Sequence, residues 1–182
     1  MAIEYEKKYI LDRRFTEQER AVIRDGRFDR FEILQVYLNR RTRIRMRIGE
    51  RDTEYFHTVK YDIGPGRCVE IEPPIAAHEF HLLRLHHGEK EVTKTRYAAV
   101  IDGCEWVVDF LRRDGRTYIA VAEIELPPDW VGDEDLIAVP DFLSPYVAYP
   151  VPGKDSKVYT NSKLSCPKYA HRVLNTVIEG RL

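Results

Sequence analysis

The chain has 182 residues, of which 32% are charged, and its 29 lysines and arginines nearly balance its 30 aspartates and glutamates. This length suits a single domain over residues 1–182 with a substantial core, and the near-zero net charge argues against a general nucleic-acid or membrane coat. The sequence contains no apolar run of the length of a signal peptide or a membrane span, so we expect a cytoplasmic protein.

Alternating apolar and polar residues predict eight β-strands. They are expected near residues 2–10, 33–39, 42–49, 54–62, 67–73, 92–101, 104–112 and 117–126. Turn signals of hairpin length separate many of them, which predicts an antiparallel sheet. These turns lie at 49–52, 62–66, 102–103 and 114–115.

Helices interrupt the strands. Thr16 and Glu19 have the spacing of a capping box, which predicts a helix over 16–25. Apolar residues at helical spacing in "IAAHEFHLLRLHHG" predict a second helix that ends at Gly88.

The C-terminal quarter is less regular. Short helices are expected at 131–138 and 168–179. Between them, "FLSPYVAYPVPGKDSK" contains too many prolines for regular structure, so we expect a loop that crosses the surface.

Charged residues recur on one face of nearly every predicted strand, and their signs are segregated. The basic members are Lys8, Arg43, Arg45, Arg47, Lys60, Lys94 and Arg96. The acidic members are Glu4, Glu6, Glu70, Glu72, Asp109, Glu123 and Glu125. For any single strand, a solvated face explains such a pattern. Like charges side by side repel, however, so each cluster needs compensation: a divalent metal for the carboxylates and a polyanion for the cations.

Eight antiparallel strands are enough to close a barrel that holds side chains or one small ligand. The charged face can then line the interior, because opposite signs in equal number offset the cost of burying them. We therefore predict a mainly β, α+β fold: a closed eight-stranded antiparallel β-barrel with helices packed outside.

The order of these motifs resembles the CYTH superfamily, the triphosphate tunnel metalloenzymes. The likeness extends from residue 3 to about residue 165. It consists of E-x-E-x-K at Glu4, Glu6 and Lys8, "QVYL", R-x-R at Arg45 and Arg47, "TEYFHTVK" ending in Lys60, E-x-E at Glu70 and Glu72, "KTRY" with Lys94 and Arg96, "VVDF" with Asp109, and "AEIEL" with Glu123 and Glu125.

The resemblance implies a tunnel in which cations hold a triphosphate and carboxylates hold Mg²⁺, or Mn²⁺ in its place. By the resemblance, the phosphate ligands are Lys8, Arg45, Arg47, Lys60, Lys94 and Arg96. The metal set is Glu4, Glu6, Glu70, Glu72, Asp109, Glu123 and Glu125, some binding metal directly and others orienting basic residues. Glu4, Glu6 and Lys8 are the catalytic candidates. Arg43 is assigned to the rim.

The C-terminal motif departs from the family pattern. Tyr159, Asn161, Ser162 and Leu164 keep its end, but Val158 stands where an arginine is expected. Neither the histidines nor the cysteines indicate a further site. His78 and His81 share a helix face but have no evident third ligand. The three cysteines show no C-x-x-C spacing, so packing roles are expected.

The leading interpretation is metal-dependent hydrolysis of a triphosphate, most simply inorganic tripolyphosphate. The alternatives are a class IV-type adenylyl cyclase, a thiamine or nucleoside triphosphatase, and a non-catalytic polyphosphate-binding module. We expect a small-molecule triphosphate as the partner of a monomer or homodimer, without nucleic acid or membrane.

Overall fold

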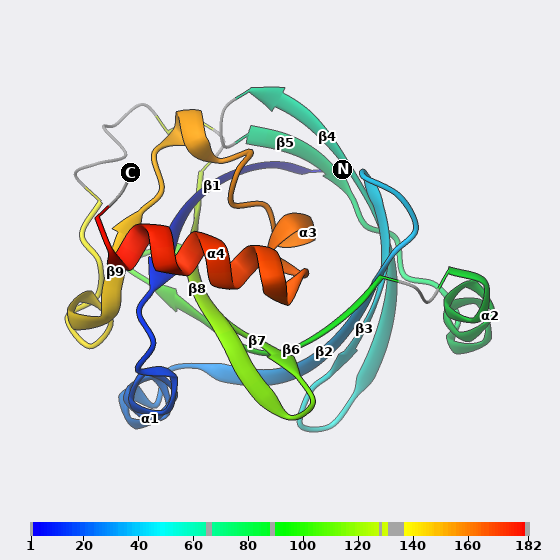
Figure 1. The fold of residues 1–182 in the computed structure, drawn as a ribbon. Helices are drawn as coiled ribbons and strands as arrows, with labels where there is room; N and C mark the ends of the chain where they lie inside the picture. Colours follow the sequence, from blue (N-terminus) through cyan, green and yellow to red (C-terminus); the bar gives the residue numbers. More distant parts are fainter. Residues whose placement is uncertain (1, 65–66, 88–89, 128, 131–136, 181–182) are drawn as a thin grey trace.

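One antiparallel sheet closes on itself to form the body of the protein (Figure 1). The computed structural model describes residues 2–64, 67–87, 90–127, 129–130 and 137–180. Its strands are β1 (Ala2–Leu11), β2 (Asp29–Tyr37), β3 (Thr42–Ile48), β4 (Thr53–Gly64), β5 (Arg67–Ile71), β6 (Glu91–Ile101), β7 (Cys104–Arg113), β8 (Arg116–Leu126) and β9 (Val147–Pro150).

The barrel closes between β5 and β1. The strands run in the order β5-β4-β3-β2-β6-β7-β8-β1, and the first half of β1 pairs back onto β5, from Ala2 opposite Glu70 to Tyr5 opposite Arg67. The predicted closed eight-stranded antiparallel barrel is therefore confirmed. β9 is an additional strand, which pairs with Tyr9 to Leu11 at the other end of β1.

Two of the expected turns have the backbone of a tight β-hairpin. Asp102 and Gly103 have φ angles of 52° and 79°, and Asp114 and Gly115 have φ angles of 51° and 75°. Paired positive φ values characterise the type I′ turn, whose twist matches that of the flanking strands. These turns align β6 with β7 and β7 with β8, and the first alignment brings Lys94 and Arg96 of β6 to Asp109 of β7.

Within the described residues, four α-helices accompany the barrel: α1 (Phe15–Asp25), α2 (Ala77–His87), α3 (Asn161–Leu164) and α4 (Pro167–Ile178). α1 and α2 lie outside the barrel wall, whereas α3 and α4 lie across one of its ends (Figure 1). The expected packing of helices outside the barrel is seen for α1 and α2. The apolar face of α4 packs across part of one end of the barrel.

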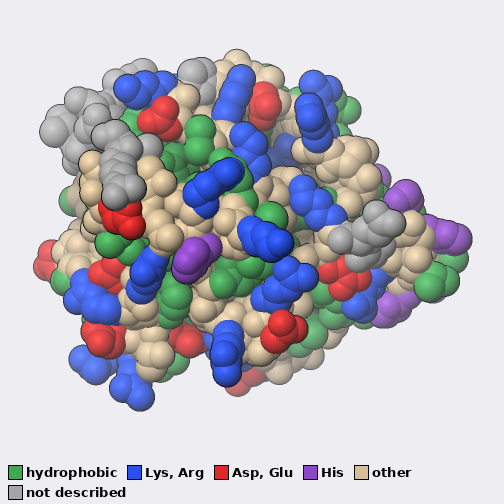
Figure 2. Space-filling view, viewed as in Figure 1, with side chains coloured by type: hydrophobic (Ala, Val, Ile, Leu, Met, Phe, Trp, Pro, Cys, Tyr) green, Lys and Arg blue, Asp and Glu red, His purple; other side chains and the backbone are tan. Residues whose placement is uncertain are grey.

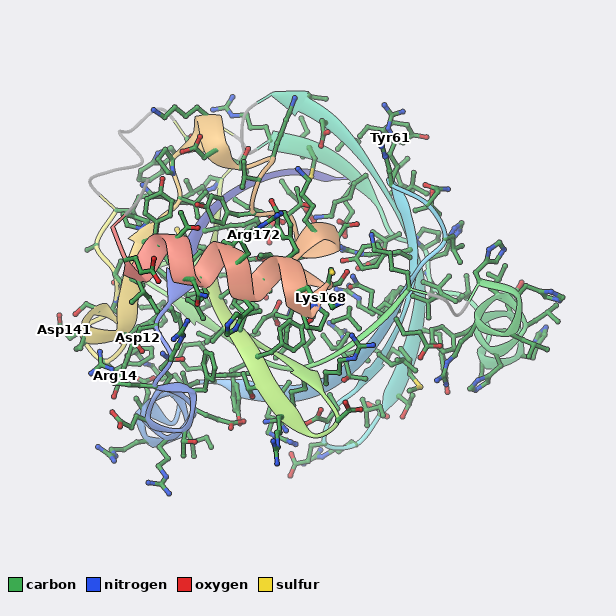
Figure 3. The ribbon with its side chains drawn as sticks, in the orientation of Figure 1. Asp12, Arg14, Tyr61, Asp141, Lys168 and Arg172 are labelled. Carbon is green, nitrogen blue, oxygen red and sulfur yellow. The ribbon has the colours of Figure 1, made fainter. Side chains whose placement is uncertain are left out.

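The interior of the barrel is divided by polarity. Near α4 it is apolar, because Ile10, Leu111, Ile119 and Val121 of the strands pack there with residues of α4 such as Leu174. Towards the other end the inward residues are charged, and alternate residues point outwards: Lys60 lies inside, while its neighbour Tyr61 projects from the outer wall with 45% of its surface exposed (Figure 3).

A second core lies on the outer face of the sheet. Tyr97, Trp106, Val108 and Phe110 are buried there beneath α1 and the segment around Leu143. The connection between β1 and α1 is fixed by Arg14, which donates to Asp12 at 2.6 Å and lies over the ring of Tyr146 (Figure 3).

Several local expectations are wrong. The helix at 16–25 forms as α1, but no capping box does: Arg14 is the N-cap, without a side-chain bond. Glu19 instead accepts hydrogen bonds from Tyr97 and Arg112. β2 begins at Asp29 rather than near residue 33, because its charged start pairs with β6.

The proline-rich segment also differs from the predicted loop, since it contains β9 and two 3₁₀ turns, η2 (Ser144–Tyr146) and η3 (Gly153–Asp155). The helix expected at 168–179 is confirmed as α4. The helix expected at 131–138 falls largely outside the described residues, as does Gly88. Cys166 is exposed, so a packing role for it is wrong. Among the described residues, no helix is long and apolar enough to span a membrane.

Replacement of Gly103 by alanine should destabilise the fold by about 1 kcal/mol, because a Cβ is disfavoured at φ +79° even where space is open. Gly64→Ala is the matched control: Gly64 also has open space around it, and its φ lies outside the left-handed region. Urea unfolding of both variants measures the difference. Equal stabilities would contradict the assigned turn.

Candidate functional site

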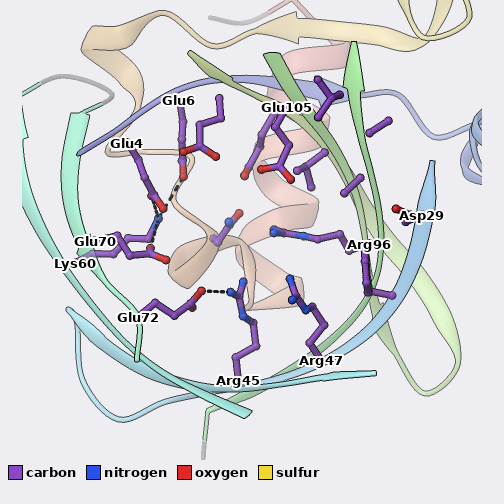
Figure 4. Close-up of a pocket in the computed structure, with 18 of the residues that line it drawn as sticks. Glu4, Glu6, Asp29, Arg45, Arg47, Lys60, Glu70, Glu72, Arg96 and Glu105 are labelled. Atoms are coloured by element: carbon purple, nitrogen blue, oxygen red, sulfur yellow. Dashed lines mark hydrogen bonds and ion pairs between the residues drawn. The ribbon is translucent and has the colours of Figure 1, made fainter. Parts of the chain in front are cut away.

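A cavity of about 410 Å³ opens at the end of the barrel away from α4 (Figure 4). The first half of β1, the whole of β3 and the last halves of β6 and β8 contribute most of its walls. It brings together many of the residues singled out in the sequence: Glu4, Glu6, Arg43, Arg45, Arg47, Lys60, Glu70, Glu72, Arg96, Glu123 and Glu125. Three others, Lys8, Lys94 and Asp109, do not line it.

Lys60 is the hub of the carboxylates in this cavity. Its Nζ lies 2.6 Å from Glu4, 3.2 Å from Glu6 and 2.7 Å from Glu70 (Figure 4). Burial alone would lower the pKa of Lys60, but these carboxylates outweigh it and raise that pKa. Burial would likewise raise the pKa of Glu6, but Lys8 and Lys60 hold it well below its usual value. Both groups therefore remain charged at neutral pH.

The opposite wall carries the arginines of β3. Arg45 donates to Glu72, and Arg43 lies 3.3 Å from Glu70. Burial, followed by the nearby Arg43 and Arg96, lowers the pKa of Arg45 to about 10. Within the described residues, the Nε atoms of both Arg43 and Arg45 are buried without a hydrogen-bond partner. This wall has more cationic donors than its carboxylates satisfy.

Arg47 is less constrained than its neighbours. It donates to Glu54 at 2.6 Å near the rim, with 34% of its side chain exposed, and it lies over the ring of Phe31 at 5.2 Å. Breaking such an exposed pair costs little. Arg47 is therefore free to turn towards an anion.

Asp109 lies inside the barrel without lining the cavity, and it pairs with two cations. It is fully buried, accepts from Lys94 at 2.5 Å, and accepts from Arg96 at 2.8 Å through both oxygens. Burial and the adjacent Arg96 lower the pKa of Lys94 to about 7, whereas the two cations overcome burial and lower the pKa of Asp109. In this arrangement Asp109 orients Arg96 towards the cavity.

Lys8 lies beyond Glu6, deeper along the barrel axis. Its Nζ is 2.8 Å from Glu6 and 2.6 Å from Glu123, and only 10% of its side chain is exposed. Lys8 thus connects the carboxylates of β1 and β8. It faces a second cavity, described below.

A row of carboxylates crosses three neighbouring strands. Glu6 is opposite Glu125, and Glu125 is opposite Glu105. Burial is the main cause that raises the pKa of Glu125 to about 7, and the nearby Glu4, Glu105 and Glu6 add to it. Burial also raises the pKa of Glu4. The row therefore carries more negative charge than its neighbours offset.

Sequence reasoning missed Glu105, although it lies four residues before Asp109 and so shares its side of β7. Trp106 separates it from the motif "VVDF", and it stands close to the turn at 102–103, where the alternation of β7 begins. Asn161 was noted only as part of a motif, but it lines both cavities.

The chemistry of this row suits a hard divalent cation such as Mg²⁺, which prefers carboxylate oxygens. The side chains as they stand are not a finished metal centre. Among the described residues, no group of three or more His, Cys, Asp or Glu side chains is placed to hold a metal ion. Glu4 and Glu6 are engaged by Lys60 and Lys8, so a cation would have to share those carboxylates.

Cys68 also points into the barrel, with its Sγ 3.5 Å from Glu4. Burial, together with the negative charge of Glu4, raises the pKa of this thiol to about 12. The thiol therefore stays protonated and is a poor nucleophile.

Comparison with solved structures identifies the fold. A crystal structure of the inorganic triphosphatase NE1496 is 24% identical in sequence, with a TM-score of 0.53, over 91% of this chain and 95% of that chain. A second structure, named the hypothetical protein NE1496, is 24% identical with a TM-score of 0.52 and covers 89% and 96%. The chain has the triphosphate tunnel fold. The expected resemblance is thus confirmed at the level of the fold. No family model matches the sequence, and no curated protein does either.

Asp109→Asn should reduce the free energy of unfolding by about 3 kcal/mol, because it leaves Lys94 and Arg96 buried beside a neutral amide. Glu54→Gln is the control, since it breaks only the exposed pair with Arg47 and should cost less than about 1 kcal/mol. Denaturant unfolding at pH 7 provides both values.

The difference in the free energy of unfolding between the wild type and Asp109→Asn should depend on pH. Because the pKa of Asp109 is lower in the folded protein, its stabilising effect is present above its unfolded pKa and is lost in acid. The gap between the wild type and Asp109→Asn should narrow as the pH falls below about 4. A gap that stays constant would contradict the buried ion pair.

Proposed function

We propose that the protein is a metal-dependent triphosphatase that hydrolyses inorganic tripolyphosphate inside the tunnel. The observation that carries this proposal is the separation of charge across one cavity: Arg45, Arg47 and Arg96 face the carboxylates of Glu4, Glu6 and Glu105 (Figure 4). The resemblance to a structure named as an inorganic triphosphatase supports it.

The arginine wall would bind the phosphates. A guanidinium matches a phosphate with two parallel N–H donors, and a buried one is worth more than an exposed one. Arg45 is 7% exposed and has an unused Nε, and Arg96 is held in place by Asp109. A polyanion here would satisfy donors that the protein leaves unsatisfied.

The carboxylate row would hold Mg²⁺, with Mn²⁺ as a substitute. Glu4, Glu6, Glu125 and Glu105 are the candidate ligands, and Glu70, Glu72 and Glu123 mainly position Arg43, Arg45 and Lys8. A bound cation supplies charge neutralisation at the phosphoryl oxygens and a water of lowered pKa.

Lys60 has a distinct part in this scheme. Its carboxylate partners are those that a cation would share, so Lys60 would turn to the phosphate oxygens when substrate binds. Asp109 would keep Arg96 directed at the transferred phosphoryl group. Lys8 would hold the carboxylates of Glu6 and Glu123 in position through its two ion pairs. The mechanism therefore depends on positioning and electrostatic stabilisation.

A substrate panel tests the reaction. Purified protein is incubated with Mg²⁺ and either tripolyphosphate or ATP, and orthophosphate, pyrophosphate and cyclic AMP are measured. We expect orthophosphate from tripolyphosphate. Pyrophosphate together with cyclic AMP from ATP would instead establish the adenylyl cyclase alternative.

The double substitution Glu4→Gln with Glu6→Gln should reduce turnover of tripolyphosphate by at least about a thousandfold, since it removes the charge that would hold the cation. Circular dichroism should show an unchanged fold. Glu17→Gln with Glu50→Gln is the matched control, because both residues are exposed and neither lines the cavity. Undiminished phosphate release would remove Glu4 and Glu6 from the mechanism.

Arg45→Ala should weaken tripolyphosphate binding by roughly 1.5–3 kcal/mol, the value of a charge-assisted hydrogen bond. Calorimetric titration in a chelating buffer measures this effect without turnover. Arg24→Ala, on the exposed face of α1, is the control for loss of one positive charge. Equal affinities for both variants would contradict the role of Arg45.

A further inference from the structure

The tunnel continues beyond the candidate active site into a second cavity of about 580 Å³. The two cavities share Glu6, Arg43, Lys60 and Asn161 as lining residues, so they meet at these side chains. The second cavity opens beside α3, between the β2–β3 turn, the end of β4 and the start of β5. We call its rim the basic mouth: Arg40, Arg41, Arg67, Lys90, Lys157 and Lys163.

The basic mouth carries positive charge without acidic partners. Among the described residues, none of its six side chains forms an ion pair with a carboxylate. Lys90 contacts Ser162 at 3.0 Å, and Lys163 donates to the carbonyl of Lys157 at 2.7 Å. Within the described part of the chain, the acidic residues lining this cavity are Asp62 and Glu6, and Glu6 is already paired with Lys8 and Lys60.

The surface view agrees with this distribution. Seen from the α4 end, Lys and Arg side chains lie over the centre of the face, where Lys168 and Arg172 belong to α4, and further cations lie on the rim beside α3 (Figures 2 and 3). The active-site cavity has the opposite bias, since its lining includes more acidic than basic residues. The two cavities along the tunnel axis therefore differ in charge: the first is mainly acidic and the second mainly basic.

Buried polar atoms at the inner end of this cavity lack partners. The hydroxyl of Tyr37, a residue only 9% exposed, has no hydrogen-bond partner among the described residues, and the same holds for Asn161 Oδ1 and Arg43 Nε. Unsatisfied buried groups are costly, and a bound ligand can satisfy them. A hydroxyl and a guanidinium are donors that suit an anion.

The cations extend further than a triphosphate needs. Arg41 and Arg47 are six residues apart along an extended chain, which spans about 20 Å at roughly 3.3 Å per residue. Arg43 and Arg45 lie between them. The backbone at Arg41 is fixed, because Asn39 Oδ1 accepts hydrogen bonds from the backbone N–H groups of Arg41 and Thr42 at 2.8 and 2.9 Å, and the Arg41 guanidinium lies 5.7 Å from the Tyr61 ring centroid.

We infer that the basic mouth binds the continuing phosphates of a linear inorganic polyphosphate whose terminal phosphates occupy the active-site cavity. This inference rests on the proposed function and specifies its substrate class. Single-stranded RNA is the less suitable polyanion. Its binding uses aromatic stacking platforms, whereas the only aromatic residue lining this cavity within the described chain is the buried Tyr37.

Each turnover would shorten the polymer by one unit. The oxygen of water bonds to the terminal phosphorus, and the bond from that phosphorus to the bridging oxygen breaks. The bridging oxygen keeps the electron pair and leaves with the shortened chain, and the protons of water pass to the products or to solvent. The remaining chain stays held by the basic mouth.

The test compares wild type with Arg40→Ala/Arg41→Ala. Both side chains are exposed, and the turn that carries them is held by backbone donors that alanine retains. The control is Arg20→Ala/Arg24→Ala, which removes the same charge from the exposed face of α1. Dissociation constants are measured in a chelating buffer for tripolyphosphate, for a linear polyphosphate of several tens of units, and for a 5′-triphosphorylated oligonucleotide.

In wild type, the long polyphosphate should bind more tightly than tripolyphosphate. Arg40→Ala/Arg41→Ala should weaken polyphosphate binding by at least about tenfold and leave tripolyphosphate within about twofold, while the control changes neither. Equal affinities of wild type for both phosphates, equal losses for both in the variant, or tighter binding of the oligonucleotide would each overturn the inference.

The binding data also separate the two proposals. If no variant and no wild-type sample releases phosphate from tripolyphosphate with Mg²⁺, the proposed hydrolysis is wrong. The measurements in chelating buffer still decide whether the basic mouth binds polyphosphate, because they require no turnover.

Discussion

The pairing of opposite charges inside a closed barrel is the constraint on which this structure depends. An unpaired ion in such a site costs several kcal/mol, so each buried cation needs an acidic partner and each buried carboxylate a basic one. Lys60 among three carboxylates, Lys8 between Glu6 and Glu123, and Asp109 between Lys94 and Arg96 meet this condition. These pairs give the candidate site a fixed geometry before any ligand arrives.

The apolar half of the interior supports the charged half. α4 and the inward residues of β7 and β8 fill one end of the barrel, so the strands cannot collapse onto the cavity or slide in register. A shift by one residue would exchange the charged and apolar faces of a strand. The core therefore specifies which side chains line the tunnel, and the stability of that core is what keeps arginines opposed to glutamates.

The pairing of charges is incomplete in two places, and both of them indicate where a ligand would bind. The row of Glu6, Glu125 and Glu105 has surplus negative charge, and the arginines of β3 with the basic mouth have surplus positive charge. A fold selected only for stability would neutralise both. A cation at the first place and a polyanion across the second would satisfy each surplus, so this difference in charge along the tunnel axis is the feature on which both proposals rest.

Alternation along single strands is a local property, so the sequence by itself determined most strands, the charged face and the residues from Glu4 to Glu125 that meet in the tunnel. The same alternation could have identified Glu105. Only the tertiary structure decided which charges pair across distant strands, since Lys8 meets Glu123, 115 residues away, where β1 pairs with β8. It also decided that α4 packs across part of one end of the barrel, that β9 pairs with β1 and that Glu19 bonds to Tyr97 rather than capping a helix. These features depend on contacts between segments that are distant in the sequence, so the periodicity within a single strand or helix cannot predict them.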